Sequence, residues 1–211
     1  MIFIRKGVIF LISVIDYGAG NLQSVVKALQ FIGCEPHITC DRDEILASDH
    51  VILPGVGSFG DCMTSLRKNH TDWAVMDCIE KGKPFLGICL GMQMLFEGSE
   101  ESPGVSGLGV LKGVIRKIPS KPSLKIPHMG WNSLDVLQSN GILAGLPQSA
   151  YVYFVHSYFL HAEEPEIVSA QTEYGVTIDA AVQCRNIHAT QFHPEKSSRA
   201  GLQILKNFVA L

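Results

Sequence analysis

The chain has 211 residues, of which 46% are hydrophobic and 18% are charged, and its formal net charge is −3. This length is enough for a substantial core, and the composition is that of a globular protein. The nearly balanced charge excludes a general electrostatic attraction to nucleic acid or to anionic membranes, so any partner must be recognised by a local surface.

The N-terminal segment has the charged and apolar parts of a signal peptide, but not its length. Arg5 and Lys6 precede the apolar run Val8–Ile15, which Asp16 ends, and no small-residue cleavage site follows. No later stretch is long enough to span a bilayer. We therefore expect Val8–Ile15 to be a buried strand and the protein to have no membrane contact.

The first half of the chain alternates between strand and helix patterns. After Val8–Ile15 and a turn, Asn21 is predicted to cap a helix that Gly33 ends. Further strands are predicted at Glu35–Thr39, at His50–Leu53, where Pro54 breaks the strand, and at Lys83–Cys89; further helices are predicted at Asp41–Ala47, Asp61–Lys68 and Asp72–Glu80 and directly after Cys89. This alternation is typical of a mainly parallel sheet with helices on both faces.

From about Gly107 the pattern changes to strands joined by Gly, Pro and Asn turns. Strands are predicted at Val110–Ile118, Ser133–Leu137, Tyr151–Leu160, Ile167–Glu173 and Val176–Gln183, and a closing helix at Ser197–Ala210. We expect this more antiparallel part to continue the same sheet. Residues 1–211 are thus predicted to form one α/β domain, a three-layer flavodoxin-like sheet extended by an antiparallel segment in its C-terminal half.

The six cysteines include no Cys-x-x-Cys pair. In a chain of this length they do not indicate a disulfide framework, so reduced thiols and a cytoplasmic location are expected. The sequence also has no metal-ligand cluster and no dinucleotide-binding fingerprint, and we expect neither a metal nor a cofactor.

The strongest local motif is Gly87-Ile-Cys89-Leu-Gly91, which joins an apolar strand to a helical pattern. This is the arrangement of a nucleophile elbow, with Cys in place of Ser. The turn is so tight that β-carbons at the two glycines would clash. The helix N-terminus would stabilise a thiolate, and the backbone N–H of Leu90 would face an oxyanion. The alternative is an ordinary buried cysteine in a glycine-containing turn.

A second motif, Gln191-Phe-His193-Pro-Glu195, contains a base and an acceptor that could orient it. Residues two apart in extended chain point the same way, so Glu195 can reach the imidazole of His193. A cysteine nucleophile needs such a base, and the base needs an acceptor for its other N–H. Taken alone, this motif is as well explained by a surface histidine beside a solvated glutamate.

A third motif, Pro54-Gly55-Val56-Gly57, follows a predicted strand. Glycines at the carboxyl end of a strand let the backbone approach a ligand, and ligands bind at this edge of open parallel sheets. A plain Pro-Gly turn is an equally good interpretation of this stretch in isolation.

Together these motifs resemble the class I (triad) glutamine amidotransferases. The resemblance implies that Cys89, His193 and Glu195 form a catalytic triad that hydrolyses glutamine. It also implies that oxyanion and substrate contacts come from Gly55, Val56, Gly57, Leu90, Gln93, His156, Ser157 and Tyr158.

Within that class, four segments resemble the glutaminase subunits of imidazole glycerol phosphate synthase: Ile15–Leu22, Pro127–Asn132, Tyr153–Tyr158 and Thr190–Ser197. The resemblance runs from about Val8 to the C-terminus. It implies a heterodimer with a (β/α)₈ cyclase subunit, which receives the ammonia through an internal channel and makes an intermediate of histidine biosynthesis and an aminoimidazole carboxamide nucleotide. The residues that the resemblance places at or near that interface are Met129, Trp131, Asn132 and Lys196.

Several alternatives remain open from the sequence. Trp131 could be ordinary core packing, Lys196 a solvated charge, and His128 and His156 hydrogen-bonded structural histidines. The chain could instead be a hydrolase that acts alone, a non-catalytic subunit, or a glutaminase that serves a paralogous synthase in surface-sugar chemistry. The sequence does not decide whether Met1–Gly7 are present in the cell.

Overall fold

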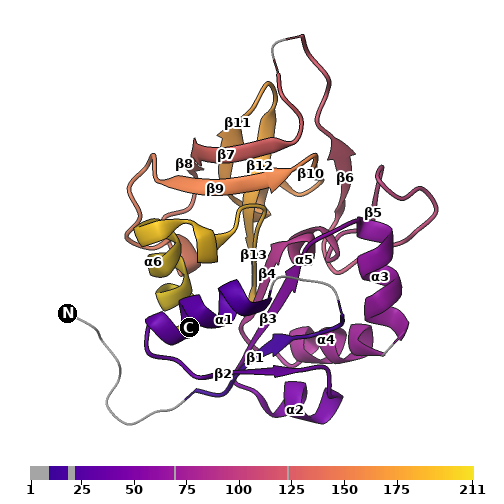
Figure 1. Ribbon diagram of the computed structural model, residues 1–211, viewed down its shortest axis with the longest axis vertical. Helices are drawn as coiled ribbons and strands as arrows, with labels where there is room; N and C mark the ends of the chain where they lie inside the picture. The colour runs from indigo at the N-terminus through magenta and orange to yellow at the C-terminus, as the bar shows by residue number, and fades with distance from the viewer. Residues whose placement is uncertain (1–9, 19–21, 69, 123) are drawn as a thin grey trace.

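The computed structural model describes residues 10–18, 22–68, 70–122 and 124–211 (Figure 1). Within them, an 11-stranded mixed sheet forms the centre and a two-stranded sheet lies beside it. The predicted α/β fold with an antiparallel extension is confirmed. In the same residues no helix is both long and apolar enough to cross a membrane.

The parallel half of the central sheet has the strand order β2-β1-β3-β4-β13. Its strands are β1 (Ile12–Ile15), β2 (Pro36–Thr39), β3 (His50–Gly55), β4 (Phe85–Cys89) and β13 (Ile187–Thr190). Each neighbouring pair is parallel. This order corresponds to the flavodoxin-like arrangement, in which ligands bind beyond the carboxyl ends of the strands.

Helices cover both faces of this sheet, as predicted. One face packs on α1 (Leu22–Phe31) and α6 (Ser198–Val209), and the other on α2 (Arg42–Ala47), α3 (Phe59–Lys68) and α4 (Thr71–Glu80). Successive side chains of a strand point to opposite faces, so Ile52 of β3 joins the first core and Leu53 joins the second. Both cores include residues of β3 and β4, the strands that lead to the candidate site.

The C-terminal half extends the sheet with antiparallel strands. They are β6 (Gly113–Lys117), β8 (Asp135–Val136), β10 (Tyr158–Ala162), β11 (Val168–Glu173) and β12 (Thr177–Cys184), with the short β5 (Gly98–Ser99) parallel to β6 at the edge. The separate sheet pairs β7 (His128–Ser133) with β9 (Tyr151–His156). The remaining helical turns are α5 (Leu90–Gln93), η1 (Gly141–Leu143), η2 (Pro165–Ile167) and η3 (Pro194–Lys196).

Two predictions about the first half need correction. The first strand begins at Ile12, not Val8: Phe10 and Leu11 lie outside it, and the earlier residues and the Asn21 cap lie outside the described part of the chain. Pro54 does not break β3, which continues to Gly55. The strand remains paired with β4 through Pro54 and Gly55, and the Pro54 carbonyl accepts a hydrogen bond from the Tyr17 hydroxyl.

Three predictions about the second half also need correction. The predicted strand Tyr151–Leu160 is two strands in two sheets, separated at Ser157, where the chain leaves β7 and joins β6 and β12. The antiparallel part therefore does not all belong to the central sheet. The strands β7 and β13 were not predicted as such; β13 is short and buried on both faces, so it has no alternating pattern to mark it.

The close contact between α6 and η3 leads to a prediction about the stability of the protein. A β-carbon on Gly201 would lie 1.8 Å from the carbonyl oxygen of Pro194, beside the candidate base. Alanine normally stabilises a helix relative to glycine, but here we expect Gly201→Ala to destabilise the protein by about 1–3 kcal/mol because the backbone must move. Thermal and urea unfolding measure this change. Lys206→Ala, on the exposed side of the same helix, is the control and should change stability by less than about 0.5 kcal/mol.

Candidate active site

The register of three parallel strands brings the predicted site residues to one edge of the sheet. Gly55, the last residue of β3, pairs with Cys89, the last residue of β4. Ile88 pairs with Thr190 at the end of β13. Because the strands run in the same direction, the chain that follows Thr190 passes alongside Cys89.

Cys89 occupies a strained turn between β4 and α5. Its φ of 55° and ψ of −109° are unusual for a residue with a β-carbon, as a nucleophile elbow requires. The flanking glycines are needed, as predicted: a β-carbon on Gly91 would lie 1.8 Å from the Leu53 carbonyl oxygen, and one on Gly87 would lie 2.8 Å from the Gly91 carbonyl oxygen. The helix that follows, however, is only four residues long, so the expected helix N-terminus contributes little to stabilising the sulfur.

His193 and Glu195 lie beside this turn and bind each other. The imidazole Nδ1 of His193 is 2.8 Å from Oε1 of Glu195, and both side chains are 3% exposed. The interpretation of this motif as a surface pair is therefore wrong. Burial alone would lower the pKa of His193, but the hydrogen bonds and negative charges of Cys89 and Glu195 outweigh it and raise that pKa to about 10. A protonated His193 facing Cys89 is the arrangement that stabilises a thiolate.

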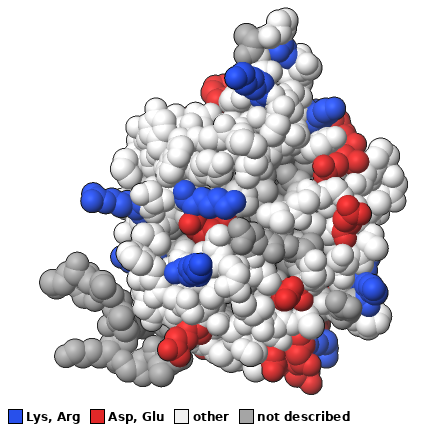
Figure 2. Space-filling model, in the orientation of Figure 1, with Lys and Arg blue, Asp and Glu red and all other residues white. Residues whose placement is uncertain are grey.

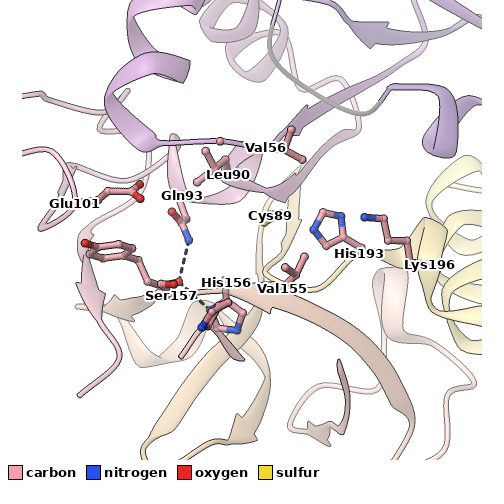
Figure 3. Close-up of a pocket in the computed structure, with 13 residues that line it drawn as sticks. Val56, Cys89, Leu90, Gln93, Glu101, Val155, His156, Ser157, His193 and Lys196 are labelled. Atoms are coloured by element: carbon pink, nitrogen blue, oxygen red, sulfur yellow. Dashed lines mark hydrogen bonds between the residues drawn. The ribbon is translucent and has the colours of Figure 1, made fainter. Parts of the chain in front are cut away.

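A cavity of about 310 Å³ opens next to Cys89. The predicted residues that line it are Val56, Gly57, Cys89, Leu90, Gln93, His156, Ser157, Tyr158, His193 and Lys196. In Figure 3, His193 lies between Cys89 and Lys196, whereas Gln93 and Glu101 lie on the other side of Cys89. Gly55 and Glu195 do not line this cavity; they border a smaller one behind it.

Four residues of the site were not predicted. Glu101, Pro127 and Val155 line the cavity, and Gln191 lies against Cys89. Gln191 had a usable signal, since it precedes His193 by two residues as His193 precedes Glu195, and such residues share a face in extended chain. Pro127 and Val155 lie within the segments Pro127–Asn132 and Tyr153–Tyr158 that carry the resemblance, whereas Glu101 lacks a comparable signal in the sequence.

The segment Pro54–Gly57, predicted to supply an oxyanion contact, is held by two side chains. The Tyr17 hydroxyl donates to the Pro54 carbonyl at 3.0 Å, and the Cys62 thiol donates to the Val56 carbonyl at 3.4 Å. A β-carbon on Gly55 would lie 2.8 Å from both the Tyr17 hydroxyl and the β-carbon of Leu90. The segment is therefore packed against the Cys89 turn on one side and exposed at Val56 on the other.

His128 and His156 form a buried pair under the cavity wall. Nδ1 of His128 lies 3.0 Å from Nε2 of His156, and Nδ1 of His156 lies 2.9 Å from the Tyr158 carbonyl oxygen. The carbonyl can only accept, so His156 donates to it from Nδ1 and accepts from His128 at Nε2. Burial lowers the pKa of His128 to about 4 and that of His156 to about 3, so both are neutral at physiological pH.

The residues predicted at a partner interface lie on β7 and beside β9. Met129 is 62% exposed and Trp131 is 52% exposed, so the interpretation of Trp131 as core packing is wrong. Asn132 is half-buried and donates from its amide to the Glu173 carbonyl. Lys196 lies over the ring of Tyr153, with 6.0 Å between its nitrogen and the ring centroid.

Comparison with known proteins agrees with this geometry. A family model described as glutamine amidotransferase class-I matches residues 13–211. The chain belongs to the class-I glutamine amidotransferase family. Two solved structures share the fold of this amidotransferase: a glutamine amidotransferase (TM-score 0.74, 20% identity, 95% of this chain and 97% of the other) and PurLQS from Thermotoga maritima (TM-score 0.72, 19% identity, 96% and 99%).

More similar relatives carry a more specific name. This amidotransferase is 49% identical over 201 residues to the imidazole glycerol phosphate synthase subunit HisH of Trichormus variabilis, covering 94% of this chain and 95% of that protein. It is 47% identical over 201 residues to HisH of Methanothermobacter thermautotrophicus, covering 95% of this chain and 98% of that protein. The described residues contain no group of His, Cys, Asp and Glu side chains placed to hold a metal ion.

The His193–Glu195 contact predicts a measurable pKa. We expect His193 to stay protonated well above pH 6.5, and Glu195→Gln to lower its pKa because the neutral amide no longer favours the charged imidazole. The pKa is raised on folding, so the stability that the pair contributes is fully present below about pH 6.5 and is lost as pH rises through about 10. NMR titration of the imidazole and urea unfolding against pH measure both. Glu163→Gln, at an exposed carboxylate, should leave the titration unchanged.

Proposed function

We propose that this chain is the glutaminase subunit of an imidazole glycerol phosphate synthase, in which Cys89, His193 and Glu195 hydrolyse glutamine to glutamate and ammonia. The observation that carries the proposal is the meeting of a strained cysteine and a buried, oriented histidine at one cavity. The family and the relatives named HisH support the same assignment.

The first half of the reaction uses the negative charge of Cys89 and the positive charge of His193. Cys89 attacks the side-chain amide carbon of glutamine as a thiolate, and protonated His193 gives its proton to the departing ammonia. This step forms a glutamyl thioester on Cys89. Neutral His193 then removes a proton from water, which hydrolyses the thioester and releases glutamate. Glu195 holds the imidazole by its Nδ1–H throughout, so Nε2 faces the reacting groups.

The cavity wall suits the amino-acid end of glutamine. The Oε1 atom of Gln93 is buried and has no hydrogen-bond partner among the described residues. It can accept from the α-ammonium group, as can the carboxylate of Glu101. The backbone of residues 156–158 forms the opposite wall, as the resemblance implies.

The oxyanion of the tetrahedral intermediate needs hydrogen-bond donors close to Cys89. The backbone N–H of Leu90 and one from Gly55–Val56 are the candidates, because both segments adjoin the elbow. Losing one such donor costs about 10²–10³-fold in rate. A peptide in this segment that turned its N–H away would therefore keep the enzyme idle until a partner subunit is ready for ammonia.

Glutamate release tests this proposal. Cys89→Ala should lower turnover by at least about 10³-fold, because the nucleophile is lost. Each protein is assayed alone, with the candidate cyclase subunit, and with that subunit plus its nucleotide acceptor; wild type should turn over strongly only in the complete mixture. Cys40→Ala, at an exposed cysteine, should behave as wild type.

Other outcomes contradict separate parts of the proposal. Full activity of the wild type alone would contradict the coupling to an acceptor. Inactivity with this cyclase despite stable binding would point to a paralogous client synthase.

All six cysteines lie in the described residues and are free, which supports a reducing compartment, and we place the protein in the cytoplasm.

We propose that the outer face of the β7–β9 sheet is the docking surface for the partner subunit, a (β/α)₈ cyclase. Met129 and Trp131 project from β7 on the same face as Tyr151 and Val155 of β9. Figure 2 shows that the surface over β7 and β8 is mostly uncharged, whereas Lys, Arg, Asp and Glu gather elsewhere on this face. Val155 and Lys196 continue this surface into the cavity, so a partner docked here would cover the route by which ammonia leaves.

Two tryptophans of similar exposure allow a matched test of this surface. Trp131→Ala should weaken binding of the cyclase subunit by about 30-fold, since exposed tryptophans at interface centres contribute about 2 kcal/mol or more. Trp73→Ala removes a tryptophan that is 60% exposed on α4, and it should leave the affinity unchanged. Titration calorimetry measures both. Equal losses for the two variants, or none for Trp131→Ala, would place the interface elsewhere.

A further inference from the structure

The side chain of Gln191 is completely buried against the Cys89 sulfur. Its Nε2 atom lies 3.7 Å from Sγ, a distance at which an amide can donate to the large sulfur atom. Gln191 directly follows β13, and the pairing of Thr190 with Ile88 puts it level with Cys89. The contact is thus set by the register of the central sheet and not by a flexible loop.

A chain of hydrogen bonds fixes which end of Gln191 faces the sulfur. The Tyr158 carbonyl can only accept, so the Gln93 group 3.1 Å from it must be the Nε2 donor. That same Nε2 donates to the side chain of Gln191 at 2.9 Å, so the atom it meets must be Oε1. Gln191 therefore presents its NH₂ group to Cys89, and a rotation of its amide by 180° would place two donors against each other.

The Tyr158 carbonyl is itself fixed from the other side. His156 donates to it, His128 donates to His156, and the Asn132 amide lies 3.4 Å from the remaining nitrogen of His128. His128 is held between the rings of Phe154 and Tyr174, with centroid separations of 4.6 and 3.9 Å. The Tyr158 carbonyl thus accepts from both His156 and Gln93, and from Gln93 onward each donor points toward the sulfur.

We propose that Gln191 is a further catalytic residue, whose amide N–H donates to the Cys89 sulfur and stabilises the thiolate that attacks glutamine. The helix α5 has only one turn, so its N-terminus contributes little to stabilising the thiolate. His193 contributes a positive charge only until it gives its proton to the departing ammonia. After that transfer Gln191 still donates to the sulfur, so it stabilises the leaving thiolate when the thioester is hydrolysed. The inference rests on the proposed role of Cys89 as the nucleophile and adds a residue to it.

The pH dependence of Cys89 alkylation tests the contact without substrate or partner. The variants below leave in place the other titratable groups around the cavity and the sulfur, which are His193, Glu195, Tyr17, Cys62, Glu101, His156, Tyr158 and Lys196. The full-length chain is treated with iodoacetamide from about pH 5 to 10, and the Cys89 peptide is quantified by mass spectrometry. Cys40 is exposed and serves as an internal reference in the same experiment.

Three variants separate donation from packing. Gln191→Met keeps the volume and removes the donor, so the alkylation midpoint of Cys89 should rise by about one pH unit. Gln191→Glu places a carboxylate at the sulfur and should raise the midpoint further. Gln171→Met removes a partly buried amide that donates to Asp179, and it should leave the midpoint unchanged. In the glutaminase assay with the cyclase and its acceptor, Gln191→Met should lower kcat about tenfold with little change in KM.

The outcomes distinguish a failure of the role of Gln191 from a failure of the role of Cys89. A midpoint well below that of Cys40 in wild type, which rises in the order wild type, Gln191→Met, Gln191→Glu, supports the inference. A low midpoint that is the same in wild type and in folded Gln191→Met overturns the role of Gln191 and leaves Cys89 as nucleophile. Should Gln191→Met not fold, the nearly isosteric Gln191→Glu decides in the same way. A wild-type Cys89 that titrates like Cys40 overturns both proposals.

Discussion

The alignment of β3, β4 and β13 is the constraint on which the site depends. Because β3 and β4 end level with each other, the Gly55 backbone lies beside the Cys89 turn. Because β13 pairs with β4 in the same direction, Gln191 and His193 reach Cys89 from its other side. A slip of one residue would exchange the two faces of a strand that is buried on both, so the two cores fix the register and, with it, the site.

Close packing at the elbow explains why this constraint is also strict in detail. Gly91 leaves no room for a β-carbon against Leu53, and Gly201 leaves none against Pro194. The first contact holds Cys89 in its strained conformation, and the second holds the turn that carries His193 and Glu195. Strain of this kind persists only where the surroundings determine the backbone, which two packed helical layers do here.

Much of this arrangement could be predicted from the sequence. The alternation of strands and helices, the elbow glycines and the i, i+2 spacing of His193 and Glu195 are local signals, and each corresponds to a feature of the structure. The division of Tyr151–Leu160 between two sheets could not be predicted, because both strands have the same β-forming composition and only distant pairing partners separate them. Glu101 reaches the cavity through tertiary packing alone, so no spacing rule identifies it.

The small β7–β9 sheet joins the proposed docking surface to the proposed nucleophile. Alternation along β7 puts Met129 and Trp131 on its outer face and His128 on its inner face. A partner that binds the outer face would restrain the strand from which the hydrogen bonds through His156 and the Tyr158 carbonyl begin. Those bonds orient the Gln93 amide, which in turn orients Gln191 at the sulfur. Since neutral histidines donate in one direction only, a displaced His128 would leave a buried acceptor unpaired, at a cost of about 1–3 kcal/mol. That is enough to favour one arrangement of the cavity wall over another by about 5- to 150-fold, so in the proposed complex this sheet would couple partner binding to glutamine hydrolysis.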